Sequence, residues 1–162
     1  MKKACLALLA AAIALAGCNG AGFPGGGLAT GPDAAASDPF TAGGKDILPR
    51  AAFGLLNDKA ADVFLLDVRS HAEHQEAHIA GDVLIPRHVL AANIANNTIY
   101  PEINRGRTPR KDQAIIVYCD VGNRSAVAAD TLRGMSYTRV RQLAGGIEAW
   151  QKADLPVVRK SP

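Results

Sequence analysis

Short apolar runs alternating with helical segments constrain the fold of this chain more than any other feature. The apolar runs lie at residues 63–66, 83–85, 115–118 and, more weakly, 140–143. Helical segments are expected at 71–75, 88–94, 124–133 and 147–152, with one more that starts near Pro49. Continuous apolar runs of this length are typical of strands buried on both faces. The alternation predicts an α/β fold, with a mostly parallel central sheet flanked by helices on both faces.

Three residues follow directly on the first three predicted strands. They are Asp67, Pro86 and Cys119. In open parallel sheets, functional residues gather at the carboxyl ends of the strands. We therefore expect these positions to share one edge of the sheet and to mark the site.

The first residues have the pattern of a targeting signal. Lys2 and Lys3 precede an apolar run at 5–15 that is too short for a stable membrane span. The run ends in Leu15-Ala16-Gly17-Cys18, which resembles a bacterial lipobox. We expect residues 1–17 to be removed and Cys18 to be acylated, although an ordinary secretory signal with a chance cysteine is the alternative. Several acyl chains are sufficient to hold a protein on a membrane.

Residues 18–45 are rich in Gly, Ala, Pro and Asp and lack the periodicity of a helix or strand. They predict a flexible tether between the lipidated Cys18 and a folded domain at 46–160. Because Asn19 follows the cysteine, the resemblance to lipoproteins places the chain in the bacterial cell envelope, on the outer membrane and facing the periplasm. The 18 basic residues fall to 16 without Lys2 and Lys3, against 15 acidic ones, so no nucleic-acid partner is expected.

Cysteine usage isolates one thiol. Of the three cysteines, Cys5 would leave with the signal and Cys18 would carry lipid, so Cys119 has no partner for a disulfide. A free thiol in an oxidising compartment is either buried and inert or reactive by design.

The residues after Cys119 favour the reactive alternative. A strand end, a turn containing Gly122 and a helix beginning near Arg124 would aim backbone N–H groups and the positive helix end at the sulfur. Both effects favour the thiolate over the thiol. Arg124 can hold an oxyanion, and Ser125 can cap the helix. The arrangement suits a nucleophile that takes an atom from an anionic donor.

Three further segments carry a family resemblance. They are Leu65-Leu66-Asp67-Val68-Arg69, the stretch from Glu76 to Pro86, and the stretch from Leu143 to Trp150 with Leu155-Pro156-Val157 behind it. Together with the Cys119 loop they resemble the rhodanese family of sulfurtransferases in single-domain form, over nearly all of 46–158.

The resemblance implies that Cys119 takes a sulfur from thiosulfate or a polysulfide, becomes a persulfide, and passes the sulfur to cyanide or a thiol. It implies no cofactor. It also implies that the pocket is formed by Asp120, Val121, Gly122, Asn123, Arg124 and Ser125, with Arg124 binding the small anionic donor.

Asp67, Arg69 and His78 are expected to support the site structurally, with Asp67 accepting loop N–H groups and His78 making a hydrogen bond in a turn. Two features depart from the family pattern. Residues 77–82 read Ala-His-Ile-Ala-Gly-Asp, where the family usually has Gly-His-Ile-Pro-Gly-Ala. Asp120 stands where thiosulfate-using members often carry a basic residue, and its carboxylate would repel a dianion.

No metal site is expected. His71, His74 and His78 share helical spacing, but no pattern of histidines and carboxylates completes a coordination shell. Two other functions remain open: a sulfur carrier or binding module supplied by a partner protein, and a phosphatase or arsenate reductase. The spacing Cys119-x4-Arg124 is one residue shorter than in the related phosphatases, which favours one sulfur over a tetrahedral phosphate.

Overall fold

The structure is a computed structural model that describes residue 40 and residues 44–160. The expected signal at 1–17, the lipidated Cys18 and most of the tether at 18–45 lie outside the described residues. In the part of the chain that is described, no helix is both long and apolar enough to cross a membrane.

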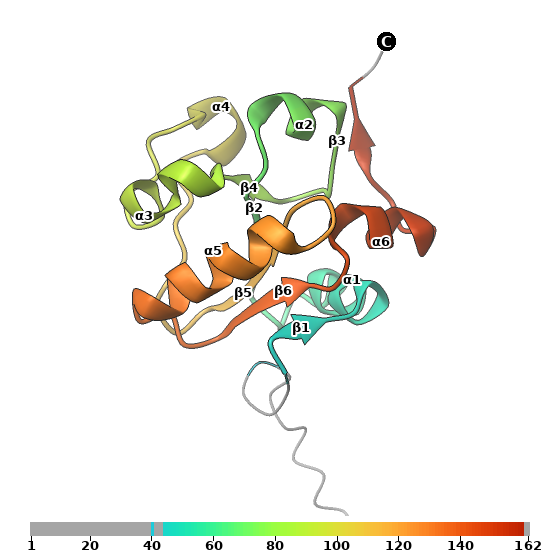
Figure 1. The fold of residues 1–162 in the computed structure, drawn as a ribbon, viewed down its shortest axis with the longest axis horizontal. Helices are drawn as coiled ribbons and strands as arrows, with labels where there is room; N and C mark the ends of the chain where they lie inside the picture. Colours follow the sequence, from blue (N-terminus) through green and yellow to red (C-terminus); the bar gives the residue numbers. More distant parts are fainter. Residues whose placement is uncertain (1–39, 41–43, 161–162) are drawn as a thin grey trace, which may run out of the picture. The chain divides into compact units, whose positions relative to one another are not determined.

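A parallel sheet forms the centre of the domain (Figure 1). Its strands are β1 (Asp46–Ile47), β2 (Val63–Asp67), β4 (Val83–Leu84), β5 (Ala114–Tyr118) and β6 (Val140–Leu143). They are ordered β1-β6-β5-β2-β4, and every neighbouring pair is parallel. The four strands expected from the apolar runs are confirmed. Strand β1 was not expected, because Asp46 and Ile47 are not part of an apolar run.

Helices cover both faces of the sheet, as predicted. The helical segments are α1 (Pro49–Asn57), α2 (His71–Glu76), η1 (Arg87–Val89), α3 (Leu90–Asn93), α4 (Pro101–Asn104), α5 (Asn123–Gly134) and α6 (Gly146–Lys152). The helix expected at 88–94 is instead a 3-10 turn followed by a single α-helical turn. Helix α4 was not expected; it is four residues long and follows a left-handed Tyr100.

Alternate strand residues pack into two separate cores. On one face, Leu66 and Val117 contact the core that includes Leu132 of α5. On the other face, Ile116 packs in the core that includes Trp150 of α6. Side chains alternate between faces along a strand, so one buried strand can supply both cores.

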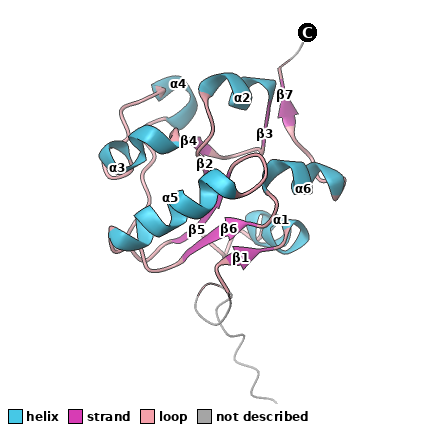
Figure 2. Cartoon of the chain, in the orientation of Figure 1, coloured by secondary structure: helices cyan, strands magenta, loops and turns pink. Residues whose placement is uncertain are grey.

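A short antiparallel ribbon lies beside α2 (Figure 2). It pairs β3 (Ala77–His78) with β7 (Val158–Arg159). The ribbon was not expected from the sequence, because each of its strands has only two residues. It fixes the chain segment that follows α2.

The carboxyl ends of the central strands meet at one edge, as expected. Asp67 of β2 is in register with Tyr118 of β5, immediately before Cys119. The amide of Ile85 donates to the carbonyl of Asp67 at 2.9 Å, which brings the end of β4 to the same edge. The strand order therefore places the Cys119 loop at the middle of this edge.

Candidate active site

Cys119 lies at the end of the central strand β5 and is almost wholly buried, with 1% of its surface exposed. The amide N–H of Gly122 donates to the Cys119 Sγ at 3.2 Å. The thiol in turn lies 3.6 Å from the hydroxyl of Ser125, to which it donates. The sulfur is therefore held by the first turn of the loop, and a thiolate there would keep at least one backbone donor.

Helix α6 orients the peptide groups of the loop. The amides of Ile147 and Glu148 donate to the carbonyls of Cys119 and Asp120, at 2.8 and 3.1 Å. In a planar trans peptide the N–H points away from the carbonyl. The N–H groups that follow these two carbonyls therefore point away from α6, as an anion cradle requires.

Two glycines make this loop possible. Gly122 has a φ of +107°, a left-handed conformation that L side chains rarely adopt. A Cβ at Gly146 would lie 2.2 Å from the carbonyl oxygen of Asp120. The turn at Gly145-Gly146 thus packs directly on the cysteine loop.

Ser125 does not cap helix α5. The left-handed Gly122 occupies the N-cap position, so the helix begins at Asn123 and Ser125 falls in its first turn. From there its hydroxyl donates to the carbonyl of Gly122 at 2.9 Å. The expectation of a serine cap was wrong, because the glycine lets the helix begin earlier.

The guanidinium of Arg124 is held by two carboxylates of the protein. It donates to both oxygens of Glu73, at 2.5 and 3.0 Å, and to Asp120. The hydrogen bonds with Glu73 are the main reason that the pKa of Arg124 is raised. The same bonds hold the pKa of Glu73 far below its usual range. An arginine at the positive end of a helix is thereby compensated within the protein.

Glu73 was not among the residues expected at the site. It is fixed by a capping box, in which the Glu73 amide donates to Ser70 Oγ and the Ser70 amide donates back to the Glu73 carboxylate. The capping box is visible in the sequence as a serine three residues before a glutamate. The contact with Arg124, 51 residues away, is not visible there.

Asp67 and Arg69 form a buried pair beside the loop. Asp67 accepts the Arg69 amide at 2.9 Å and its guanidinium at 2.7 Å, as expected of a residue that fixes a turn. Burial raises the pKa of the Asp67 carboxyl. Arg69 also lies 3.6 Å from the carboxylate of Asp120. Burial and the neighbouring Glu73 raise the pKa of Asp120.

The remaining predicted residues occupy different places. Val121 is half-exposed at the tip of the loop, and Asn123 opens α5. His78 lies on β3, where its Nδ1–H donates to the carbonyl of His74 at 3.0 Å. A hydrogen bond for His78 was expected. The structure does not place it among the contacts of the cysteine loop.

Comparison with known proteins identifies the family. The model of the rhodanese-like domain matches residues 51–153, well over half of the chain. The chain belongs to the rhodanese-like domain family. The resemblance noted in the sequence and the fold it implied are thereby confirmed.

Relatives of this rhodanese-like chain include named sulfurtransferases. A sulfurtransferase of Allochromatium vinosum is 34% identical over 97 residues, which cover 60% of this chain and 79% of the relative. The thiosulfate sulfurtransferase PspE of Escherichia coli is 31% identical over 83 residues, covering 51% and 69%. The human single-domain sulfurtransferase TSTD1 shares the fold with a TM-score of 0.60 at 23% identity, covering 68% of this chain and 97% of that one. The two bacterial relatives support sulfur transfer as the general activity, and the human protein supports the fold.

Proposed function

We propose that the protein transfers a sulfane sulfur from a small donor, through a persulfide on Cys119, to cyanide or a thiol. One observation carries the proposal: the Cys119 Sγ accepts the Gly122 amide at 3.2 Å, in a loop whose peptides are oriented by α6. Amides that hold a thiolate can also hold the terminal sulfur of a persulfide, which is likewise an anion.

The cycle consists of two displacements and needs no external oxidant or reductant. The Cys119 thiolate attacks the outer sulfur of the donor, and a new S–S bond forms to Cys119. The donor's own bond to that sulfur breaks and its electron pair leaves with the rest of the donor. Cyanide or a thiolate then attacks the outer sulfur of the Cys119 persulfide. The S–S bond breaks, the product carries the sulfur away, and the thiolate is restored.

Charge at the loop favours some donors over others. The guanidinium of Arg124 already faces the carboxylates of Glu73 and Asp120, and Arg69 already faces Asp67. To pair with either guanidinium, a thiosulfate dianion would have to displace one of these carboxylates. A singly charged polysulfide or organic persulfide meets less repulsion. We therefore place such donors ahead of thiosulfate.

Steady-state assays with polysulfide and with thiosulfate test the proposal. Cyanide or a thiol serves as acceptor. We expect transfer with the wild type, faster with polysulfide, and none above background with Cys119→Ala. Cys18→Ala is the matched control, because it removes a cysteine outside the loop. The enzyme proposal fails if Cys119→Ala transfers sulfur from either donor as fast as the wild type does.

A sulfur carrier supplied by another protein is the second candidate. Val121, beside the cysteine, and Val127, on the following helix, are both about half exposed. Apolar side chains so close to the reactive group suit contact with a partner protein. Under this alternative, small donors give no turnover, but protein taken from cells carries a persulfide on Cys119. Mass spectrometry of Cys119 in freshly purified protein distinguishes the two.

We also propose that Cys18 carries lipid and anchors the protein to the outer membrane, facing the periplasm. Support comes from the sequence Leu15-Ala16-Gly17-Cys18 and from the apolar run before it. Labelling with a radioactive fatty acid should mark the wild type and not Cys18→Ala. Label retained in Cys18→Ala would refute the anchor, and Cys5→Ala is the control that should keep it.

A further inference from the structure

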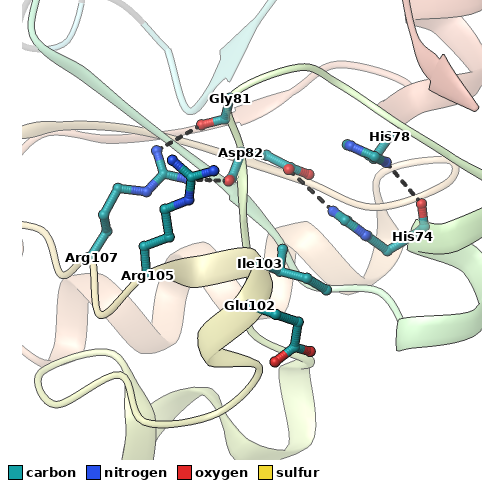
Figure 3. A pocket seen from close by; sticks show the side chains of 8 residues that line it. All are labelled: His74, His78, Gly81, Asp82, Glu102, Ile103, Arg105 and Arg107. Carbon is teal, nitrogen blue, oxygen red and sulfur yellow. Dashed lines mark hydrogen bonds and ion pairs between the residues drawn. The ribbon is translucent and has the colours of Figure 1, made fainter.

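A second cluster of reactive side chains lies outside the cysteine loop. His74 of α2, His78 of β3 and Asp82 of the following turn line a cavity of about 520 Å³ (Figure 3). One potential ligand atom from each of them lies within 4.8 Å of the other two. We propose that these three residues bind one divalent transition-metal ion, for which Zn²⁺ is the natural probe.

The two buried ligands are already at the right separation. His74 Nε2 lies 3.2 Å from Asp82 Oδ1, a hydrogen bond that the ion would replace, with the Nε2 proton released to water or to the other ring nitrogen. Zinc binds imidazole nitrogen and carboxylate oxygen at about 2.0–2.2 Å, so two ligands of a tetrahedral ion are roughly 3.3 Å apart. An ion can therefore sit between these two atoms without moving either residue far.

Hydrogen bonds around the cluster set the tautomer of His78 and orient the carboxylate of Asp82. His78 Nδ1–H donates to the carbonyl of His74 at 3.0 Å, which leaves the lone pair on Nε2. The Tyr118 hydroxyl donates to Asp82 Oδ2, which leaves Oδ1 to face His74. Arg107 donates to the carbonyls of Gly81 and Asp82 and fixes the turn. Partners of this kind are typical around metal ligands.

Burial and access also suit a metal. His74 and Asp82 are each 4% exposed, so their polar atoms are shielded from competing water. His78 is only partly buried and faces the open cavity, which provides an entry path and a fourth position for water. In Figure 3 the carboxylate of Glu102 points away from the histidines, so the ligand set is limited to two imidazoles and one carboxylate.

One movement is required. The rings of His74 and His78 are stacked, with centroids 4.0 Å apart and planes 12° apart. Imidazole donates its lone pair in the plane of the ring, so one ion cannot lie in both planes while the rings stay parallel. The His78 ring must turn out of the stack toward the cavity, and in doing so it gives up the hydrogen bond from its Nδ1–H to the carbonyl of His74. Its partial exposure leaves room for this rotation.

The sequence alone indicated no metal site because the third ligand was hidden. His71 shares the helical spacing, but its ring stacks on Tyr100 and contacts the amide of Gln75, and it is not among the three clustered ligands. Asp82, which follows the turn after β3, supplies the third ligand atom in place of His71. The cluster is also separate from the thiol, because Tyr118 and Cys119 belong to the cores on opposite faces of the sheet.

Competition between the purified full chain and a chromophoric chelator for Zn²⁺ tests the proposal. We expect one equivalent of Zn²⁺ to bind to the wild type, and equally to Cys119→Ser. His78→Ala and Asp82→Asn should weaken binding by at least about tenfold, since even the loss of an outer-shell partner costs that much. His71→Ala is the matched control on the same helix and should bind like the wild type. Circular dichroism verifies that each variant is folded.

Proton NMR adds a readout of the movement. Zn²⁺ should shift the ring signals of His74 and His78, because the stack opens, and leave those of His71 unchanged. The proposal is overturned if the wild type does not bind Zn²⁺ saturably, or if His78→Ala binds as well as His71→Ala. It is also overturned if Cys119→Ser alone abolishes binding, since the thiolate would then be the ligand. None of these outcomes depends on sulfur transfer.

Discussion

Replacing Gly146 by alanine should damage the cysteine loop from outside it. Gly146 has a φ of +61°, where an L residue costs roughly 1–2 kcal/mol. The new Cβ would lie 2.2 Å from the carbonyl oxygen of Asp120, whereas real Cβ contacts almost never fall below 3.0 Å. The cysteine loop and α6 must therefore separate by about 1 Å, a displacement that can cost an active site roughly a hundredfold in rate.

The separation also strains two hydrogen bonds, from the amides of Ile147 and Glu148 to the loop carbonyls. Each contributes about 0.5–1.5 kcal/mol, so with the backbone strain we expect a total loss of about 2–5 kcal/mol of stability. Urea denaturation followed by circular dichroism measures the stability. Sulfur transfer from polysulfide, assayed in parallel on the folded fraction, measures the damage to the loop.

Gly106→Ala is the matched control. Gly106 has nearly the same φ, +66°, but a Cβ there meets nothing within 4 Å. Gly106→Ala should therefore lose only about 1–2 kcal/mol of stability, from the backbone strain of a left-handed alanine, and should keep the transfer rate of the wild type. If the two variants were equally stable and equally active, the close approach of α6 would have no role in forming the site.

Three further results are expected. Glu73→Gln should raise kcat/KM for thiosulfate roughly tenfold relative to kcat/KM for polysulfide, because the change frees Arg124 from one charged partner. Steady-state kinetics with both donors measures this ratio, and an unchanged ratio would contradict the charge argument. The same variant should be less stable than the wild type by about 1–2 kcal/mol at neutral pH, a value discounted for partial exposure. Because Arg124 lowers the folded-state pKa of Glu73, this difference should persist above about pH 5 and shrink as the pH falls, in urea titrations at several pH values. Trp150→Ala should cost about 3–5 kcal/mol, since the ring is buried and its Nε1–H donates to Pro156; a loss below 1 kcal/mol, roughly the effect of a surface change, would contradict the packing described.

Strands β2, β4 and β5 could be predicted because each contains a continuous apolar run that is buried on both faces. Ala114–Tyr118, for example, is buried at every position. Strands β1, β3 and β7 have two residues each and α4 has four. They are too short to show the alternating pattern of a strand or the 3.6-residue pattern of a helix. The three strands form by pairing with segments far away in the sequence, β1 with β6 and β3 with β7.

The site was predictable where it is local. Cys119, the turn at Gly122 and the helix after it are contiguous, so chemistry and geometry can be inferred together. Glu73 could not be assigned to the site, because its contact with Arg124 exists only once α2 packs on the loop. The contact between His74 and Asp82 likewise depends on the turn between them.

The central claim is that Cys119 carries the transferred sulfur. Mass spectrometry of the wild type after incubation with polysulfide, followed by removal of the donor, tests it most directly. We predict that the peptide containing Cys119 gains the mass of one sulfur atom, and that added cyanide removes this sulfur and releases stoichiometric thiocyanate. A protein that turns over polysulfide and cyanide while Cys119 stays unmodified, or equally fast as Cys119→Ala, would contradict the account.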